Sequence, residues 1–255
     1  MEISLLKIVG AALTIGVRVT GLLLFAPFFG SVAIPPRIKA VLVLFITAVL
    51  YPVFSSRLSP VSATQWPVLM LSEFTVGAGV GIATNLVFDA VQMAGQVLSV
   101  QMGYSLINIL DPQTQVDTTV VAVFYQTIVM LIFLRLDVHH WLLRAIANSF
   151  YYLPPGSAHL NQLFTRAAFE VGARVFAVGL QIAAPVLSAT LVADILLGLL
   201  GKVSAQLPLM LLGPALKSLL GLTIMVAALK YWPDLFQYLF TNSMAYAEGL
   251  LHLAR

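Results

Sequence analysis

The chain lacks cysteine altogether and carries few charged residues. Without cysteine, disulfide bonds, thiolate metal sites and cysteine nucleophiles are excluded. Charged residues make up only 9% of the 255 residues, whereas soluble domains usually carry roughly 25%. The 13 lysines and arginines are scattered singly, so no basic patch suggests nucleic-acid binding. A surface with so little charge must face lipid or other proteins.

Recognisable signatures of catalysis are also missing. The sequence has no P-loop, no G-x-S-x-G and no H-E-x-x-H motif, and no carboxylate pair stands in a context that suggests acid–base chemistry. His139 and His140 are adjacent, so on a helix their side chains point about 100° apart. His159 and His252 are isolated, and this spacing is not typical of a zinc site. We expect no cofactor, no metal and no enzymatic activity.

What the sequence has in abundance is apolar residues, at 60% of the chain. A bilayer core of about 30 Å needs about 20 helical residues. No period-2 alternation suggests a barrel, so the spans should be helices. The sequence predicts an all-α polytopic membrane protein with a single domain over residues 1–255. Its apolar helices, about six, lie at Leu5–Phe29, Ile38–Phe54, Trp66–Phe88, Thr119–Leu134, Phe169–Leu200 and Leu209–Tyr231.

Other stretches are more polar or are interrupted by proline. Asp137–Tyr152 and the amphipathic tail 233–255 have apolar residues on one helical face, which predicts interfacial or protein-packed helices. Gln92–Asp117 is rich in Gln, Asn and Asp, and is either an ordinary polar loop or a segment that lines a cavity. Pro185 should kink or break the fifth apolar segment, either beside a cavity or for packing alone.

Ionisable residues inside the apolar segments need a partner or a wet surface, because charge is costly at membrane depth. Asp194 and Lys217 have no local partner in the sequence. They indicate either an ion or proton path or, as we favour, pairing between helices or between subunits of an assembly. The candidates for such packing and intersubunit contacts include the charged residues Arg18, Glu73, Asp89, Asp194 and Lys217.

Small residues form two further candidate packing faces. Gly77 and Gly81 make a G-x-x-x-G pair, and Gly213, Lys217 and Gly221 are spaced at i, i+4 and i+8. A groove of small residues lets another helix backbone approach closely. The second groove contains Lys217, so we expect a partner group near its ammonium.

An ordered set of short strings resembles the FliR family of flagellar type III export proteins, which has relatives in injectisomes. The resemblance covers roughly residues 10–225. Its strings are Arg18–Gly21, Ala26–Gly30, Ile34–Lys39, Gly95-Gln96, Gln101–Ser105, Asp111-Pro112, Ser149-Phe150, Leu153–Gly156, Leu196–Lys202, Ala205–Leu207 and Gly213–Lys217.

The resemblance implies a helical hetero-oligomeric gate in the bacterial inner membrane, at the flagellar basal body. Its helices would form hairpins beside FliP-like and FliQ-like subunits, with FlhB-like and FlhA-like export proteins as further partners and unfolded proteins as substrates. It also implies that a loop plugs the closed channel. The plug and pore candidates are Gly103, Tyr104, Ser105, Ile107, Asn108, Ile109, Leu110, Asp111, Pro112 and Asp117. The alternatives are an injectisome gate subunit or an ion-coupled small-solute transporter.

Overall fold

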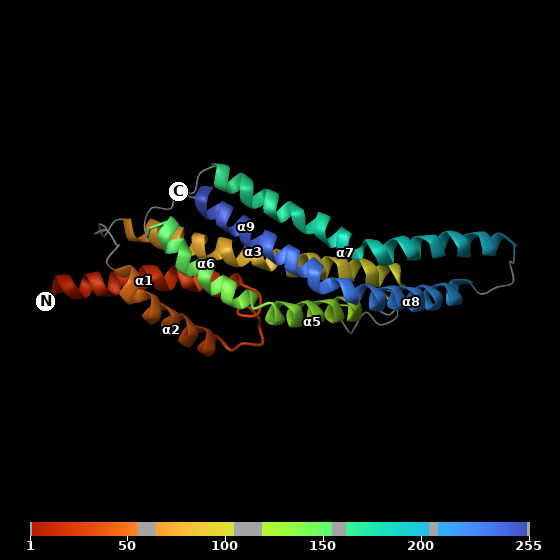
Figure 1. The fold of residues 1–255 in the computed structure, drawn as a ribbon, viewed down its shortest axis with the longest axis horizontal. Helices are drawn as coiled ribbons and strands as arrows, with labels where there is room; N and C mark the ends of the chain where they lie inside the picture. Colours follow the sequence, from red (N-terminus) through yellow and green to blue (C-terminus); the bar gives the residue numbers. More distant parts are fainter. Residues whose placement is uncertain (1, 56–64, 105–118, 155–161, 204–208, 254–255) are drawn as a thin grey trace. The chain divides into compact units, whose positions relative to one another are not determined.

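The computed structural model describes residues 2–55, 65–104, 119–154, 162–203 and 209–253, and within these ranges the regular structure is helical (Figure 1). A short 3-10 helix, η4, covers Leu229–Tyr231. The α-helices are α1 (Glu2–Phe25), α2 (Pro36–Phe54), α3 (Trp66–Gln101), α5 (Val120–Arg135), α6 (Val138–Tyr152), α7 (Gln162–Val203), α8 (Leu209–Ala228) and α9 (Trp232–Leu253).

Most of these helices are long and apolar enough to cross a membrane. Among the described residues there are five such spans, or up to six if α5 and α6 are one span broken by a sharp bend. The prediction of an all-α polytopic membrane protein is therefore confirmed. Proline helps to place one boundary: α2 begins at Pro36, where the missing N–H of proline costs no helical hydrogen bond.

The described residues form two compact units, and the single-domain interpretation stays a prediction. Unit 1 comprises Met1–Val87, Phe133–Ala173 and Leu239–Arg255, and unit 2 comprises Phe88–Ile132 and Arg174–Tyr238. Each unit is described by itself below.

In unit 1, α1 and α2 lie side by side, and α6 also contacts α1 (Figure 1). The buried side of α1 follows the helical repeat and includes Ala11, Ile15, Val19 and Leu22. The predicted amphipathic stretch at 137–152 forms α6, whose buried side chains are Val138, Leu142, Ile146, Ser149 and Phe150. The predicted amphipathic tail is likewise helical, within α9.

In unit 2, small residues allow close helix contacts. Gly95 of α3 lies against the backbone of Ala122 of α5, so a methyl group there would collide with it. Gly179 of α7 lies against Ala90 and Met93 of α3. The rings of Tyr125 and Trp232 pack 4.6 Å apart between their centroids.

One expectation about a helix end was wrong, and one of the two alternatives for Pro185 is excluded. The third apolar helix does not stop near Phe88, because α3 continues through the glutamine-rich stretch to Gln101. Pro185 was expected to kink or break its helix. It does not break it, because α7 runs from Gln162 to Val203 with Pro185 inside it, and the kink stays a prediction. In both cases the helix continues where hydropathy or a single residue suggested an end. At Pro185 it continues because a proline removes only one hydrogen bond of a long helix.

Candidate functional site

The side chain of Arg18 is the centre of a buried polar cluster in unit 1. Its Nε donates to Oε2 of Glu73 at 2.6 Å, and both side chains are fully buried. Its Nη1 donates to the hydroxyl of Ser149 at 3.1 Å and to the carbonyl oxygen of Leu153 at 3.0 Å. The Ser149 hydroxyl donates in turn to the carbonyl oxygen of Ile146 at 2.7 Å. The cluster thus joins α1 and α3 to α6 and the residue that follows it.

Aromatic rings cover this cluster. The guanidinium carbon of Arg18 lies 4.1 Å from the centroid of the Phe150 ring, which is a cation–π contact. Phe54, at the end of α2, stacks on Phe150 with 5.0 Å between the ring centroids. The rings keep water from the ion pair, so its electrostatic attraction acts in a low-dielectric environment. Four helices of unit 1, α1, α2, α3 and α6, contribute residues to this cluster and its aromatic cover.

Glycines allow the backbones of α1 and α3 to touch beside the cluster. A methyl group at Gly77 would collide with the carbonyl oxygen of Arg18, and one at Gly21 would collide with that of Phe74. At Gly81 it would lie 2.8 Å from the carbonyl oxygen of Leu22. The Gly77 and Gly81 face is therefore occupied by α1 of the same chain. Because the two backbones are this close, the short side chain of Glu73 can contact the guanidinium of Arg18.

Unit 2 contains a second ion pair, between α7 and α8. Lys217 Nζ lies 2.9 Å from Oδ1 of Asp194, and Gln101 Nε2 donates to the other carboxylate oxygen at 2.8 Å. The Lys217 side chain is 18% exposed and that of Asp194 is 41% exposed, so this pair is half open to its surroundings. Asp194 and Lys217, which have no local partner in the sequence, thus pair within one chain. Gln101, the last residue of α3, bonds to Asp194 as well.

The C-terminal end of α3 is closed by a Schellman motif. The N–H of Tyr104 donates to the carbonyl oxygen of Ser99, and the N–H of Gly103 donates to that of Val100. Gly103 has a φ of 88°, in the left-handed region that favours glycine. A side chain there would also lie 2.8 Å from Cβ of Pro214. A side chain is therefore disfavoured at Gly103, just beyond the last residue of α3, Gln101.

This end of α3 also packs against α8. The Ser218 hydroxyl donates to the carbonyl oxygen of Met102 at 3.0 Å. The Met102 side chain fills the space above Gly221, whose added methyl would meet its sulfur at 2.9 Å. Gly213 lies in ordinary contact with Leu197, with 3.8 Å from an added methyl to Cδ1. The second glycine face thus receives α3 and α7 of the same chain.

The remaining predicted residues are placed only in part. Asp89 lies on an exposed position of α3. Of the plug and pore candidates, the structure describes Gly103 and Tyr104. The candidates Ser105, Ile107, Asn108, Ile109, Leu110, Asp111, Pro112 and Asp117 lie outside the described residues.

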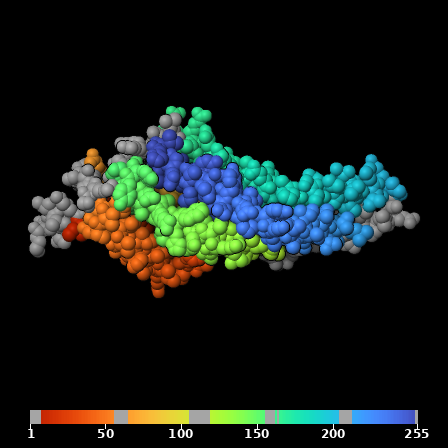
Figure 2. Space-filling model, in the orientation of Figure 1, coloured from red at the N-terminus to blue at the C-terminus, as the bar shows by residue number. Residues whose placement is uncertain are grey.

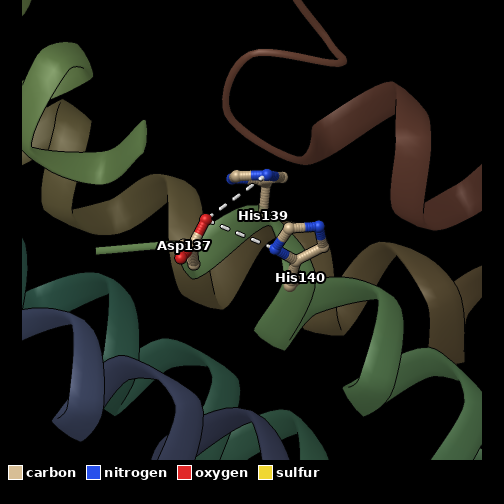
Figure 3. A group of neighbouring side chains, drawn as sticks. All are labelled: Asp137, His139 and His140. Atoms are coloured by element: carbon tan, nitrogen blue, oxygen red, sulfur yellow. Dashed lines mark ion pairs between the residues drawn. The ribbon is translucent and has the colours of Figure 1, made fainter. Parts of the chain in front are cut away.

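A cluster that the sequence reasoning missed lies at the turn between α5 and α6. Asp137, His139 and His140 point toward one another there (Figure 3). Asp137 Oδ1 lies 3.4 Å from Nδ1 of His140 and 3.9 Å from Nε2 of His139. The spacing argument considered histidine pairs alone. The signal that could have found the cluster is the run Asp-Val-His-His, in which an aspartate at the helix start can turn back toward both imidazoles.

The comparison with protein families decides which group of proteins the chain belongs to. A family model described as "Bacterial export proteins, family 1" matches residues 9–243. The chain belongs to this family. Curated relatives in it are named flagellar biosynthetic protein FliR. That of Escherichia coli K12 is 28% identical over 88% of this chain and 86% of its own length, and that of Bacillus subtilis 168 is 24% identical over 98% of both. That of Aquifex aeolicus is 26% identical over 83% of this chain and 82% of its own length.

Family membership indicates the membrane and the assembly to which the helices belong. This chain is a member of the bacterial export proteins and has several apolar helices of membrane length. It is therefore a component of the flagellar export apparatus in the bacterial inner membrane, at the basal body. Several of the strings that carried the resemblance coincide with the contacts described above. Arg18 and Gly21 lie at the buried ion pair and the α1–α3 contact, and Gly103 ends α3.

Proposed function

We propose that the chain is a non-enzymatic subunit of the flagellar type III protein-export gate. In this proposal it forms, with FliP-like and FliQ-like subunits, the channel through which unfolded flagellar proteins leave the cytoplasm. The observation that carries the proposal is the family match over residues 9–243, together with curated relatives that are named flagellar biosynthetic protein FliR. Those names favour a flagellar gate over the injectisome alternative.

Exposed apolar surface supports a role inside an assembly. On α2 (orange in Figure 2) only Thr47 and Phe54 are buried, and its exposed large side chains are apolar. These side chains are Ile38, Val41, Leu44, Phe45, Val49 and Val53. Beside it, an apolar groove of about 420 Å³ lies between α1 and α2, lined in part by Leu23 and Val43. Such surfaces need lipid or a partner helix to cover them.

The structure of the polar clusters fits a scaffold with fixed helices. The Arg18 cluster ties α1, α3 and α6 together by charge-assisted hydrogen bonds, which are stronger than neutral ones. We infer that the energy for export comes from partner proteins, with FlhA-like and FlhB-like proteins as the candidates, because the sequence has no nucleotide-binding motif. On sequence grounds we also propose that residues 103–117 contribute the plug of the closed channel.

The deciding experiment is native mass spectrometry of the complex after mild detergent extraction from its own cell. We expect the chain to be recovered together with FliP-like and FliQ-like proteins. A stable monodisperse monomer, never found with such subunits, would contradict the proposal. A chain with Leu44→Arg and Phe45→Arg on the exposed α2 face tests the surface directly, because two buried guanidinium groups should block any partner helix. Arg166→Ala, on an exposed side chain elsewhere in unit 1, is the matched control.

A measurement in cells and one with the purified chain separate the flagellar proposal from its alternatives. Deletion of the gene should abolish swimming and secretion of flagellar proteins, while secretion by an injectisome stays intact. The transporter alternative predicts solute flux by the purified chain alone in liposomes, lost in Asp194→Asn. Flux of that kind with normal flagella in the deletion strain would overturn the proposal.

The plug proposal has its own test. Deleting Ile107–Leu110 should make the assembled gate leak ions and slow growth, since an apolar constriction is what seals a pore at rest. Ion permeability is measured against cells with the intact chain at equal abundance. Unchanged permeability in cells that assemble the gate would remove the plug assignment.

A further inference from the structure

The turn between α5 and α6 has an unusual backbone. Asp137 stands at the N-cap position of α6 with φ 54° and ψ 28°, in the left-handed region. Aspartate adopts this region more readily than most residues, although at a cost. An aspartate at an N-cap usually accepts a hydrogen bond from the first turn of the helix, but the Asp137 side chain makes no such bond. Its carboxylate is instead directed at two imidazoles (Figure 3).

The three groups have the separation that a small metal ion requires. A tetrahedral ion bound at 2.0–2.1 Å by nitrogen and oxygen holds its ligand atoms about 3.3–3.4 Å apart. His140 Nδ1 lies 3.4 Å from Asp137 Oδ1, and His139 Nε2 lies 3.9 Å from it. The three ligand atoms all lie within 4.8 Å of one another. Small rotations of the exposed His140 and Asp137 side chains would close the remaining difference.

The environment leaves the correct nitrogens available. Nδ1 of His139 is buried and has no hydrogen-bond partner in the described part of the protein, so Nε2 is the nitrogen that meets the carboxylate. The imidazole of His139 is held at this position by the ring of Phe133, 6.3 Å away between centroids. The side chains of His140 and Asp137 are 58% and 65% exposed, so an ion can reach them from outside.

We propose that Asp137, His139 and His140 form a binding site for a divalent transition-metal ion of the zinc and nickel class. Imidazole nitrogens are preferred by zinc, copper and nickel, whereas magnesium and calcium take oxygen ligands. Three protein ligands leave one coordination position open. The three ligands lie within four consecutive residues, 137–140. A bound ion would therefore fix the left-handed turn at Asp137 and the first turn of α6. This inference does not depend on the proposed export function.

The site should be of moderate affinity. Histidine ligands in strong zinc sites donate their second N–H to an acceptor, and losing that acceptor weakens binding about 10–100-fold. His139 has no such acceptor among the described residues. Binding should therefore be reversible by a common chelator, and it should leave the helices where they are.

The test uses the full chain with a streptavidin-binding tag, since a polyhistidine tag would bind the same ions. The protein is extracted in mild detergent, treated with EDTA, freed of it and titrated with Co²⁺ while visible absorption is followed. Zn²⁺ is then added to displace the cobalt. We expect one ion per chain, with an absorption band typical of tetrahedral nitrogen and oxygen ligands. His140→Ala and Asp137→Asn should each weaken binding at least tenfold.

The matched control is His252→Ala, which removes an exposed histidine on α9 outside the cluster. Its titration should equal that of the unchanged chain. The helix content of every variant is compared by circular dichroism, and His140→Ala should fold normally because its side chain is mostly exposed. Binding of less than about a tenth of an equivalent, or equal binding by His140→Ala and the unchanged chain, would overturn the proposal. Loss of binding in His252→Ala alone would overturn it as well.

Discussion

Removing one member of the buried ion pair should destabilise unit 1 strongly. In Glu73→Met the guanidinium of Arg18 stays fully buried and loses its carboxylate partner. Breaking a buried pair in this way typically costs about 3–5 kcal/mol. Arg18 keeps two neutral hydrogen bonds and the contact with Phe150, so we expect the lower end, about 3 kcal/mol. That is about a hundredfold change in the folding equilibrium.

The double variant Arg18→Met with Glu73→Met should be more stable than Glu73→Met alone. It buries no charge, and a well-packed apolar pair often replaces a buried ion pair without loss. The Ser149 hydroxyl and the Leu153 carbonyl oxygen lose their donor, which costs about 1 kcal/mol each. Recovery should therefore be incomplete, and the two substitutions should be strongly non-additive.

Thermal unfolding of the detergent-solubilised chain, followed by circular dichroism, measures the effect. A loss of about 3 kcal/mol corresponds to a lower midpoint by about 6–12 °C for a chain of this size. The control is Arg166→Ala, which breaks an ion pair with Glu170 whose side chains are 79% and 61% exposed. An exposed pair contributes about 0–1 kcal/mol at most. The readout is the order of midpoints, because a chain with two compact units need not unfold in one step. Equal midpoints for Glu73→Met and Arg166→Ala would refute the reasoning.

Three further predictions use the same measurement. Gly77→Ala should lower the midpoint by an amount equivalent to about 1–3 kcal/mol, because its methyl meets the α1 backbone. Gly79→Ala, with no atom within 4 Å of the added methyl, should leave the midpoint unchanged or raise it, and equal effects at the two glycines would contradict the contact. Gly103→Ala should cost about 1–2 kcal/mol for the left-handed φ alone, and a neutral result would mean that α3 ends differently. Lys217→Met should cost less than Glu73→Met, about 1 kcal/mol, because Asp194 is partly exposed and keeps Gln101. A loss as large as that of Glu73→Met would contradict the partial exposure of this pair.

The helices could be predicted from sequence because apolar length and proline positions are local properties. The start of α2 at Pro36 and the amphipathic α6 follow from a few neighbouring residues. The end of α3 was missed because hydropathy falls after Phe88, whereas the helix continues to Gln101 and Gly103 follows with a left-handed φ. A helix with polar side chains continues wherever no residue breaks its hydrogen bonds.

The partners of the charged residues could not be predicted, since they depend on contacts between distant segments. Arg18 meets Glu73 across 55 residues and Ser149 across 131. Nothing in the local sequence states that α1 and α3 approach within backbone contact, although Gly77 and Gly81 indicated that some helix would. For Asp137 the missing information was conformational, because only its left-handed backbone turns the carboxylate toward the histidines.

The wide sequence separation within the Arg18 cluster has a consequence for the synthesis and membrane insertion of the protein. At about 5–20 residues per second, the ribosome completes Glu73 about 3–11 s after Arg18, and Ser149 about 7–26 s after it. An arginine at the centre of a newly inserted helix costs about 2.5–3.5 kcal/mol, which the apolar residues of α1 must offset alone during that interval. The complete set of partners for the Arg18 guanidinium therefore exists only once α6 and Leu153 have been synthesised.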